Sequence, residues 1–343
     1  MTTLRSLDEL AQAGLIQRRD VAALAPVARR YAIGVTPTVT SLIRHEVADG
    51  PMARQFLPDM RELEHLPHDL TDPIGDAAHS PVKGVVHRHA DRVLLKLLLT
   101  CPVYCRFCFR RESVGQGQGT LSAIETEAAL AYIAGDPAIW EVILTGGDPL
   151  MLSARRLGVL MARLASIPHV KIIRLHSRVP VVAPELITPA VVAALRHSGA
   201  TTYVAVHANH PRELGDAALV ALAALADSGI PLISQSVLLR GVNDDLMTLA
   251  ALMRGFVEAR VKPYYLHHPD LAPGTAHFRL SLAEGQSLIA ALRRQISGLA
   301  MPIYVLDIPG GFGKVPLAPS AVQQTAEGLM IMDPSGRMHP YSS

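Results

Sequence analysis

A strand-then-helix rhythm that begins after His87 leaves few possible folds for this chain. Short apolar runs typical of buried strands alternate with longer runs whose apolar residues recur at helical spacing. This alternation is typical of parallel β-α units in which helices cover the sheet. Six units are many for a small open sheet and two short of an eight-unit barrel, so we expect an α/β fold, a partial (βα)6 TIM-like barrel. The expected strands are 92–100, 140–145, 170–175, 202–206, 231–237 and 263–266, and the expected helices are 121–134, 153–166, 189–197, 216–228, 246–259 and 282–297.

Two regions without the strand-then-helix pattern flank the expected barrel. Residues 1–85 show helical apolar spacing in three stretches and then a Pro-rich break, which predicts an N-terminal helical region. The barrel is expected to occupy 86–300. A seventh apolar strand at 301–306 opens a C-terminal segment, 301–343, that ends in a mixed tail.

Composition excludes several classes of protein. With 49% hydrophobic and 18% charged residues, the chain has too much apolar content for a disordered protein. Its most apolar run, 93–99, is broken by Lys96 and is too short to span a membrane, and acidic residues near the N-terminus do not suit a secretory signal, so we expect a cytoplasmic protein. A net charge of +2, no basic block and 4% aromatic residues argue against a nucleic-acid partner.

The three cysteines of the protein, Cys101, Cys105 and Cys108, all lie within eight residues. An odd number in one short segment does not suit a disulfide framework. The CxxxCxxC spacing can hold three corners of a [4Fe–4S] cluster and leave the fourth iron open to a non-protein ligand. The alternative is a zinc site completed by His87 or His89, although zinc motifs usually come as two ligand pairs separated by a loop.

Polar residues follow almost every expected strand. Because chemistry in α/β barrels lies at the carboxyl ends of the strands, these residues should meet at one mouth of the barrel. In chain order they are Cys101, Gly146-Gly147-Asp148, His176-Ser177-Arg178, His207 and Asn209, Gln235, and Asp270.

A CxxxCxxC motif directly after the first barrel strand resembles the radical S-adenosylmethionine superfamily. The resemblance implies that the open iron binds S-adenosylmethionine, which on reduction releases a 5′-deoxyadenosyl radical. It therefore also implies an electron donor such as flavodoxin or ferredoxin. Gly146, Gly147 and Asp148 look like the superfamily's turn for the methionine amino group, and His207 and Gln235 resemble further contacts with S-adenosylmethionine. Without the resemblance, each would be read as an ordinary turn or core residue.

Longer stretches resemble one family within that superfamily, the lysine 2,3-aminomutases. They run from about residue 87 to 317 and include HRHADRVLLKLLLTCPVYCRFCFRR, VILTGGDPLM, KPYYLHHPDLAPGTAHFRL and YVLDIPGGFGKVP. The resemblance implies pyridoxal 5′-phosphate (PLP) as a second cofactor, attached to Lys314. GGFGKV does not fit a phosphate-binding P-loop, because Ile308 and Val315 replace its required Gly and Ser or Thr.

The same resemblance implies roles for five charged residues. Arg88 and Arg92 match the arginines that bind the PLP phosphate, and Arg110 matches the arginine that binds the substrate carboxylate. Asp270 and Asp307 match the two aspartates that hold the distal ammonium group of lysine. The alternatives are solvated surface charges for the arginines and turn caps for the aspartates.

The implied reaction is the conversion of L-lysine to β-lysine. The chain departs from the lysine-fermentation enzymes in one respect, because it has no fourth cysteine for a structural zinc and carries Asp245 at one such position. This departure resembles the branch that isomerises lysine for attachment to elongation factor P, although the DIPGGFGK loop looks more like the free-lysine enzymes. Two other readings stay open: a non-catalytic iron–sulfur redox protein, and a PLP-free radical enzyme that modifies RNA or protein.

Overall fold

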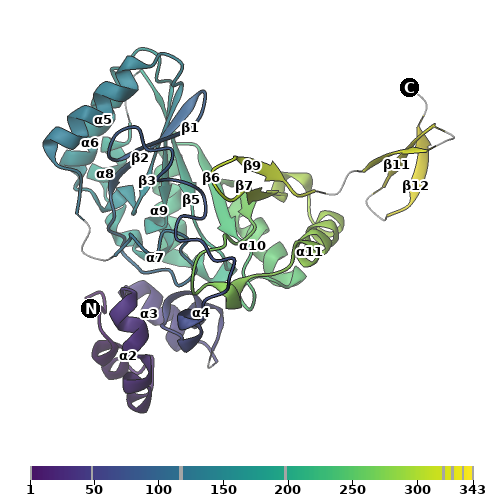
Figure 1. The fold of residues 1–343 in the computed structure, drawn as a ribbon, viewed down its shortest axis with the longest axis horizontal. Helices are drawn as coiled ribbons and strands as arrows, with labels where there is room; N and C mark the ends of the chain where they lie inside the picture. Colours follow the sequence, from purple (N-terminus) through teal and green to yellow (C-terminus); the bar gives the residue numbers. More distant parts are fainter. Residues whose placement is uncertain are drawn as a thin grey trace.

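The computed structural model describes residues 2–47, 49–115, 119–196, 199–318, 321–325, 328–333 and 336–341. Within them, nine strands form one sheet whose spatial order follows the chain from β1 to β9. Strands β2 to β8 are parallel, while β1 and β9 add antiparallel edges. Their bounds are β1 Val85–His89, β2 Arg92–Leu98, β3 Glu141–Gly146, β4 Ile172–Ser177, β5 Thr201–Val206, β6 Leu232–Val237, β7 Val261–His267, β8 Ile303–Asp307 and β9 Lys314–Pro316. The curled sheet confirms the predicted partial barrel (Figure 1).

Helices follow the parallel strands in the predicted order and cover the outside of the sheet (Figure 1). Side chains at their first positions fix where several begin: Ser122, Ser153 and Ser281 each accept a hydrogen bond from the backbone amide three residues on. The predicted helix end at His197 lies outside the described residues. The helix bounds are α5 Ala123–Gly135, α6 Ala154–Ala165, α7 Val179–Val182, α8 Pro189–Ala194, α9 Asp216–Asp227, α10 Leu246–Glu258 and α11 Leu282–Gln295.

The inner face of the sheet is unusually polar for parallel strands, which are commonly apolar on both faces. On β2, Val93, Leu95 and Leu97 are buried and belong to the hydrophobic core. Lys96 alternates with them, and on β4 Arg174 and His176 alternate with buried Ile173 and Leu175 in the same way. Since successive side chains point to opposite faces, the helix-covered face is apolar and the enclosed face carries charges. This polar interior is where a ligand site is expected.

Four short helices of the N-terminal region lie below the barrel in Figure 1. They are α1 Leu7–Gln12, α2 Val21–Arg30, α3 Pro37–Arg44 and α4 Pro51–Phe56, of which α4 lies in the stretch predicted to be irregular. Backbone hydrogen bonds from Tyr104 to Gly34 (2.9 Å) and from Arg106 to Gln55 (2.8 Å) join this region to the cysteine loop.

The C-terminal tail is more regular than the sequence predicts. After β9, the strands β10 Val322–Thr325, β11 Gly328–Met332 and β12 Met338–Tyr341 form a separate antiparallel sheet, drawn in yellow in Figure 1.

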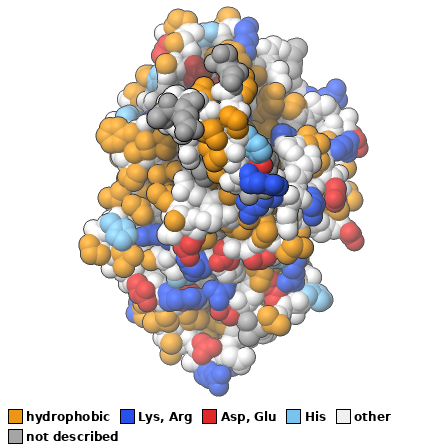
Figure 2. Space-filling model, turned by 90° about the vertical axis from the view of Figure 1, so that its right-hand side faces the viewer, with side chains coloured by type: hydrophobic (Ala, Val, Ile, Leu, Met, Phe, Trp, Pro, Cys, Tyr) orange, Lys and Arg blue, Asp and Glu red, His pale blue; other side chains and the backbone are white. Residues whose placement is uncertain are grey.

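On the face shown in Figure 2, basic and acidic side chains are interspersed. No helix within the described residues is long and apolar enough to cross a membrane. The remaining short 3-10 helices are Arg18–Asp20, Met60–Leu63, Pro149–Met151, Pro184–Leu186, Pro211–Glu213, Ala276–Phe278 and Gly298–Ala300.

Candidate active site

The three cysteines occupy the loop that follows β2, as predicted, and all three are free thiols. The Cys108 amide donates to the Cys105 carbonyl (3.1 Å), which folds the loop back on itself. Burial raises the pKa of every one of these thiols, that of Cys108 to about 11; Cys105 raises the pKa of Cys108 further, whereas Arg178 partly offsets the rise at Cys105. Buried thiols of this kind need a bound metal to hold them as thiolates.

The donor set suits an iron–sulfur cluster better than a zinc ion. His87 Nδ1 lies 2.8 Å from the Tyr132 hydroxyl, and the charged neighbours of His89 are Arg92, Arg88, Lys314 and Asp91 rather than the thiols. Three thiols without a nearby histidine leave a zinc tetrahedron incomplete but can hold a [4Fe–4S] cluster with one open iron.

A buried arginine, Arg178, lies against the cysteine loop, and sequence reasoning had placed it only among the residues that follow a strand. Its guanidinium donates to Cys105 Sγ (2.9 Å) and to Glu213 (2.7 Å), and it stacks on Phe107 at 5.3 Å from the ring centre. A cation that donates to sulfur stabilises negative charge on that sulfur. Its position directly after β4, where barrel enzymes carry their chemistry, was the signal available in the sequence.

The predicted turn of Gly146, Gly147 and Asp148 packs directly under the start of the cysteine loop. The Gly147 amide donates to Leu98 (2.6 Å), and a Cβ on Gly147 would lie 2.4 Å from the Thr100 carbonyl oxygen. The Asp148 carboxylate accepts hydrogen bonds from the Ser177 hydroxyl and from the amides of Leu150, Arg178 and Val179. Asp148 therefore fastens the loops after β3 and β4 to each other.

Lys314 and the two predicted substrate aspartates come together at the other side of the barrel mouth. The Lys314 ammonium contacts both carboxylate oxygens of Asp307, at 2.5 and 2.7 Å, and His267 Nδ1 lies 3.2 Å from the same carboxylate. Lys314 and His267 thereby hold the pKa of Asp307 well below its ordinary value, against the effect of burial.

Asp270 has the opposite electrostatic character. Burial and the neighbouring Asp307 raise its pKa to about 7, and Lys314, Arg110 and Arg88 only partly offset this. Asp307 therefore stays charged, whereas Asp270 gains or loses its proton near neutral pH.

The three arginines predicted to bind anions have different ion-pair partners in this structure. Arg88 and Arg110 both face the carboxylate of Asp76, a residue that sequence reasoning missed because it lies in the Pro-rich break. Arg92 instead pairs with its neighbour Asp91 (2.7 Å), yet it lies near enough to His89 to add to the lowering of the pKa of His89 by burial.

Several buried polar atoms around this interior have no hydrogen-bond partner among the described residues. They are Asp76 Oδ1, His176 Nε2, His207 Nε2 and Gln235 Oε1. Burial, with nearby cations, holds the pKa of His176 and His207 well below the ordinary value, so both imidazoles are neutral. Buried polar groups are normally hydrogen-bonded, so such a cluster indicates a binding site for a polar ligand. Of the two predicted contacts with S-adenosylmethionine, Gln235 also lies 3.1 Å from His267.

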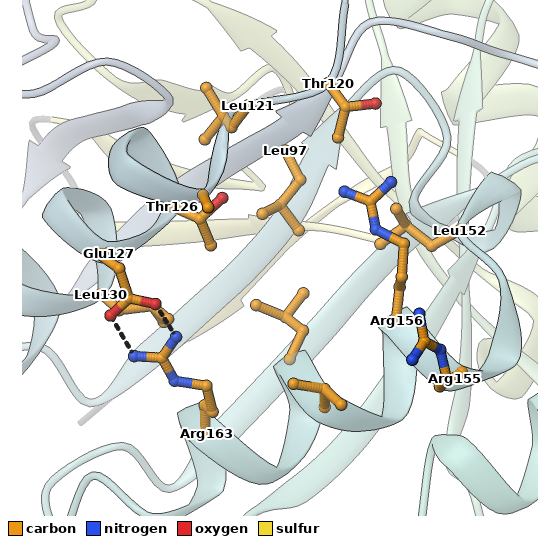
Figure 3. Close-up of a pocket in the computed structure, with 13 residues that line it drawn as sticks. Leu97, Thr120, Leu121, Thr126, Glu127, Leu130, Leu152, Arg155, Arg156 and Arg163 are labelled. Carbon is orange, nitrogen blue, oxygen red and sulfur yellow. Dashed lines mark hydrogen bonds and ion pairs between the residues drawn. The ribbon is translucent and has the colours of Figure 1, made fainter.

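A separate cavity of about 360 Å³ lies on the outside of the barrel, between α5 and α6 (Figure 3). Its lining includes Leu97, Leu121 and Leu152, with the ion pair of Arg163 and Glu127 at one side. None of the predicted site residues lines it.

Comparison with known proteins agrees with this geometry. The model of the Radical SAM superfamily matches residues 96–253, the part of the chain that holds the cysteines and the first strands of the barrel. A half-barrel whose first parallel strand, β2, leads into a three-thiol loop, together with this match, defines a radical S-adenosylmethionine enzyme, and such an enzyme uses a [4Fe–4S] cluster and S-adenosylmethionine.

Curated relatives point to one family within that superfamily. The chain is 36% identical over 340 residues to the L-lysine 2,3-aminomutase of Clostridium subterminale, covering 99% of this chain and 82% of that protein. It is 41% identical over 300 residues to that of Acetoanaerobium sticklandii (88% and 72% covered) and 39% identical over 270 residues to that of Escherichia coli (78% of each). The chain belongs to the lysine 2,3-aminomutase family and is an isomerase.

Proposed function

We propose that this protein converts L-lysine to β-lysine with a [4Fe–4S] cluster, S-adenosylmethionine and PLP. The observation that carries the proposal is the distribution of charge in the barrel interior. Asp270 and Asp307 form an acidic end, whereas Arg88, Lys96 and Arg110 form a basic end around Asp76. Lysine bears an ammonium at one end and a carboxylate at the other, so its charges complement this site.

The residues present also suit the cluster, S-adenosylmethionine and PLP. The cluster would be held by Cys101, Cys105 and Cys108. The proposed surroundings of S-adenosylmethionine are Gly146, Gly147, Asp148, His207 and Gln235. Among these, Asp148 would act by fixing the shape of the turn, since its carboxylate already accepts hydrogen bonds from the protein. Lys314 would hold PLP, with Arg88 and Arg92 at its phosphate. PLP supplies an aldehyde that combines with amines and a conjugated ring that can stabilise an unpaired electron.

The protein's own residues divide the remaining work. Asp307 keeps its negative charge beside Lys314 and His267, and it would be available to a substrate ammonium when Lys314 holds the cofactor. Arg110 binds the substrate carboxylate, which sets the direction of lysine in the site. The neutral imidazoles of His176 and His207 offer hydrogen bonds without adding charge to the interior.

The division into 1–85, 86–300 and 301–343 has a functional meaning in this proposal. The first part supplies Asp76, the barrel supplies the cysteines, and the last part supplies Asp307 and Lys314. An electron donor such as flavodoxin or ferredoxin would reduce the cluster, and the expected place of action is the cytoplasm.

An anaerobic assay tests the proposal. The reconstituted protein should form β-lysine from L-lysine when S-adenosylmethionine, PLP and a strong reductant are present, and omission of any of them should stop the reaction. A protein that carries about four irons per chain by the cluster assignment and a full complement of PLP, yet leaves lysine unchanged, would exclude this function for free lysine.

The branch linked to elongation factor P is the second candidate, because the chain has no fourth cysteine. At the position of one such zinc cysteine, Asp245 caps helix α10 by accepting from the Thr248 amide (2.9 Å). Conversion of free lysine is compared with the mass gained by elongation factor P, with and without its lysyl-transferring ligase. Negligible β-lysine from free lysine, together with ligase-dependent β-lysylation of the factor, would favour this branch.

A further inference from the structure

The segment 72–80, which connects the N-terminal helices to β1, touches both the lysine-bearing loop and the basic end of the site. Gly75 adopts a φ of +68°, and a Cβ there would lie 2.6 Å from the Gly310 carbonyl oxygen, so the segment packs backbone against backbone on the loop that leads to Lys314. The Arg88 guanidinium donates to the Ile74 carbonyl from the other side. This clamped position brings the next residue, Asp76, into the interior.

Asp76 is the common partner of three cations. Its carboxylate lies 2.9 Å from Arg110 Nε, 3.1 Å from Lys96 Nζ and 4.0 Å from Arg88 Nη2. The residue is only 7% exposed, and its Oδ1 atom has no hydrogen-bond partner among the described residues. Burial would raise the pKa of Asp76, but Arg110 and Lys96 lower it to about 2, so the carboxylate is charged at neutral pH.

The contact with Asp76 determines which side of the Arg110 guanidinium is available. Within the described chain, Asp76 is the one hydrogen-bond partner of this side chain, and it uses Nε. The guanidinium also lies over the Phe109 ring, 4.4 Å from its centre. A guanidinium held at Nε and on one flat face presents its two terminal nitrogens as a fork, which matches the two oxygens of a carboxylate.

We propose that Asp76 is the positioning residue of the substrate-carboxylate site: it holds Arg110 through Nε so that both terminal nitrogens face the carboxylate of the amino acid. The inference rests on the proposed function, since it takes Arg110 as the carboxylate-binding residue. A purely neutralising role for Asp76 leads to the opposite expectation. Removal of one negative charge from among three cations strengthens the attraction for anions, whereas loss of a positioning contact weakens carboxylate binding.

The sign of the effect is measured with Asp76→Asn in protein that holds its cluster and PLP but receives no S-adenosylmethionine, so that no turnover occurs. The dissociation constants of L-lysine and of 1,5-diaminopentane, which is lysine without the carboxylate, are read from the change in PLP absorption. We expect the constant for lysine to rise by about tenfold or more, as for a lost charged contact, while that for 1,5-diaminopentane stays unchanged.

Two further variants separate positioning from damage to the fold. Asp69→Asn removes another buried carboxylate of the N-terminal region, which is paired with Arg279 at 2.7 Å, and it should change thermal stability but not lysine binding. Asp76→Glu keeps the charge but displaces it, and it should show a smaller loss that is again confined to lysine; it serves in place of Asp76→Asn if that variant does not fold.

Equal or tighter lysine binding in Asp76→Asn would overturn the inference, and so would an equal loss for both ligands. A wild-type protein whose PLP absorption does not respond to lysine would contradict the proposed function instead.

Discussion

At the scale of single residues, Lys314 and Asp307 balance each other's charge across 2.5 Å. Lys314 would no longer offer Asp307 a free ammonium group when it holds PLP, because an imine nitrogen is a weaker and differently placed partner. The carboxylate would then be buried without its strongest partner, which is unfavourable. A substrate ammonium restores that partner. The same aspartate can thus serve the empty site and the site that holds lysine.

Lys314→Ala should abolish the absorption of imine-bound PLP while the protein keeps its iron, because the two cofactors use separate residues. The measurement is the ultraviolet-visible spectrum after PLP addition, with borohydride trapping and peptide mapping. Lys171→Ala, which removes an exposed lysine, is the matched control and should keep the band. A band that survives in Lys314→Ala would show that another lysine anchors PLP.

Asp270 should lower the stability of the protein at neutral pH. Its pKa rises from an ordinary 3.8 to about 7 because of burial and Asp307, so the folded protein holds this proton more tightly than the unfolded chain does. Stability therefore falls as pH rises from about 4 to about 7. Asp270→Asn should remove that penalty and stabilise the PLP-free protein at pH 8 by up to about 4 kcal/mol, at about 1.36 kcal/mol per pKa unit.

Denaturant unfolding at a series of pH values measures the effect, and the difference between Asp270→Asn and wild type should shrink as pH falls toward 4. The same variant should bind lysine more weakly, by about 2–5 kcal/mol, because it loses one partner of the substrate ammonium. A pH-independent difference in stability would contradict the raised pKa of Asp270.

At the scale of elements, the end of β3 supports the cysteine loop through a contact that leaves no room for a side chain. Gly147→Ala would place a Cβ 2.4 Å from the Thr100 carbonyl oxygen, next to Cys101. Relief of this clash must move the loop, so we expect impaired cluster loading and a loss of stability of about 1–3 kcal/mol. Iron content and the visible spectrum of the reconstituted protein are the readouts. In Gly158→Ala, the control, the new Cβ has its nearest contact at 3.6 Å, and cluster loading should be normal.

Regular elements with a local signal could be predicted from the sequence. The strand that ends before Gly146 and the helix that begins after Ser122 are found within a few residues of their predicted bounds, because apolar period and capping residues are local properties. By contrast, β1, β9 and the C-terminal sheet were missed. Each is defined by pairing with another strand, and β9 carries only exposed residues, Lys314–Pro316, so no burial pattern marks it.

The candidate site divides in the same way. The cysteines, Lys314 and the aspartates could be proposed from the sequence because short motifs carry them, and the structure brings Lys314 into contact with Asp307. Asp76 could not be proposed in this way, since its importance lies in its contact with Arg110, far along the chain. Arg178 was marked only by its place after a strand, and its contact with Cys105 could not be predicted.

At the scale of the whole molecule, a buried group of charges ties the N-terminal region to the cysteine loop. Glu62 accepts from both Arg106 and Arg111, and all three side chains are fully buried. Glu62→Gln should cost about 3–5 kcal/mol of unfolding free energy, because two guanidinium groups would be left in the interior with no carboxylate. Denaturant unfolding measures this cost. Asp227→Asn, which breaks an exposed pair with Arg260, should leave the curve almost unchanged, and an equally mild Glu62→Gln would show that the region is not tied in this way.

The polar inner face of the barrel has a consequence for the life of the protein in a cell. A fold whose centre is lined with charges gives up part of the stability that an apolar centre would provide, and whatever fills that centre restores it. A ligand present at a hundredfold excess over its dissociation constant adds about 2.7 kcal/mol to the folded state. Under the proposed function, protein that has not received its cofactors would be the more readily unfolded and degraded form, so cofactor supply would influence the abundance of this protein as well as its catalysis.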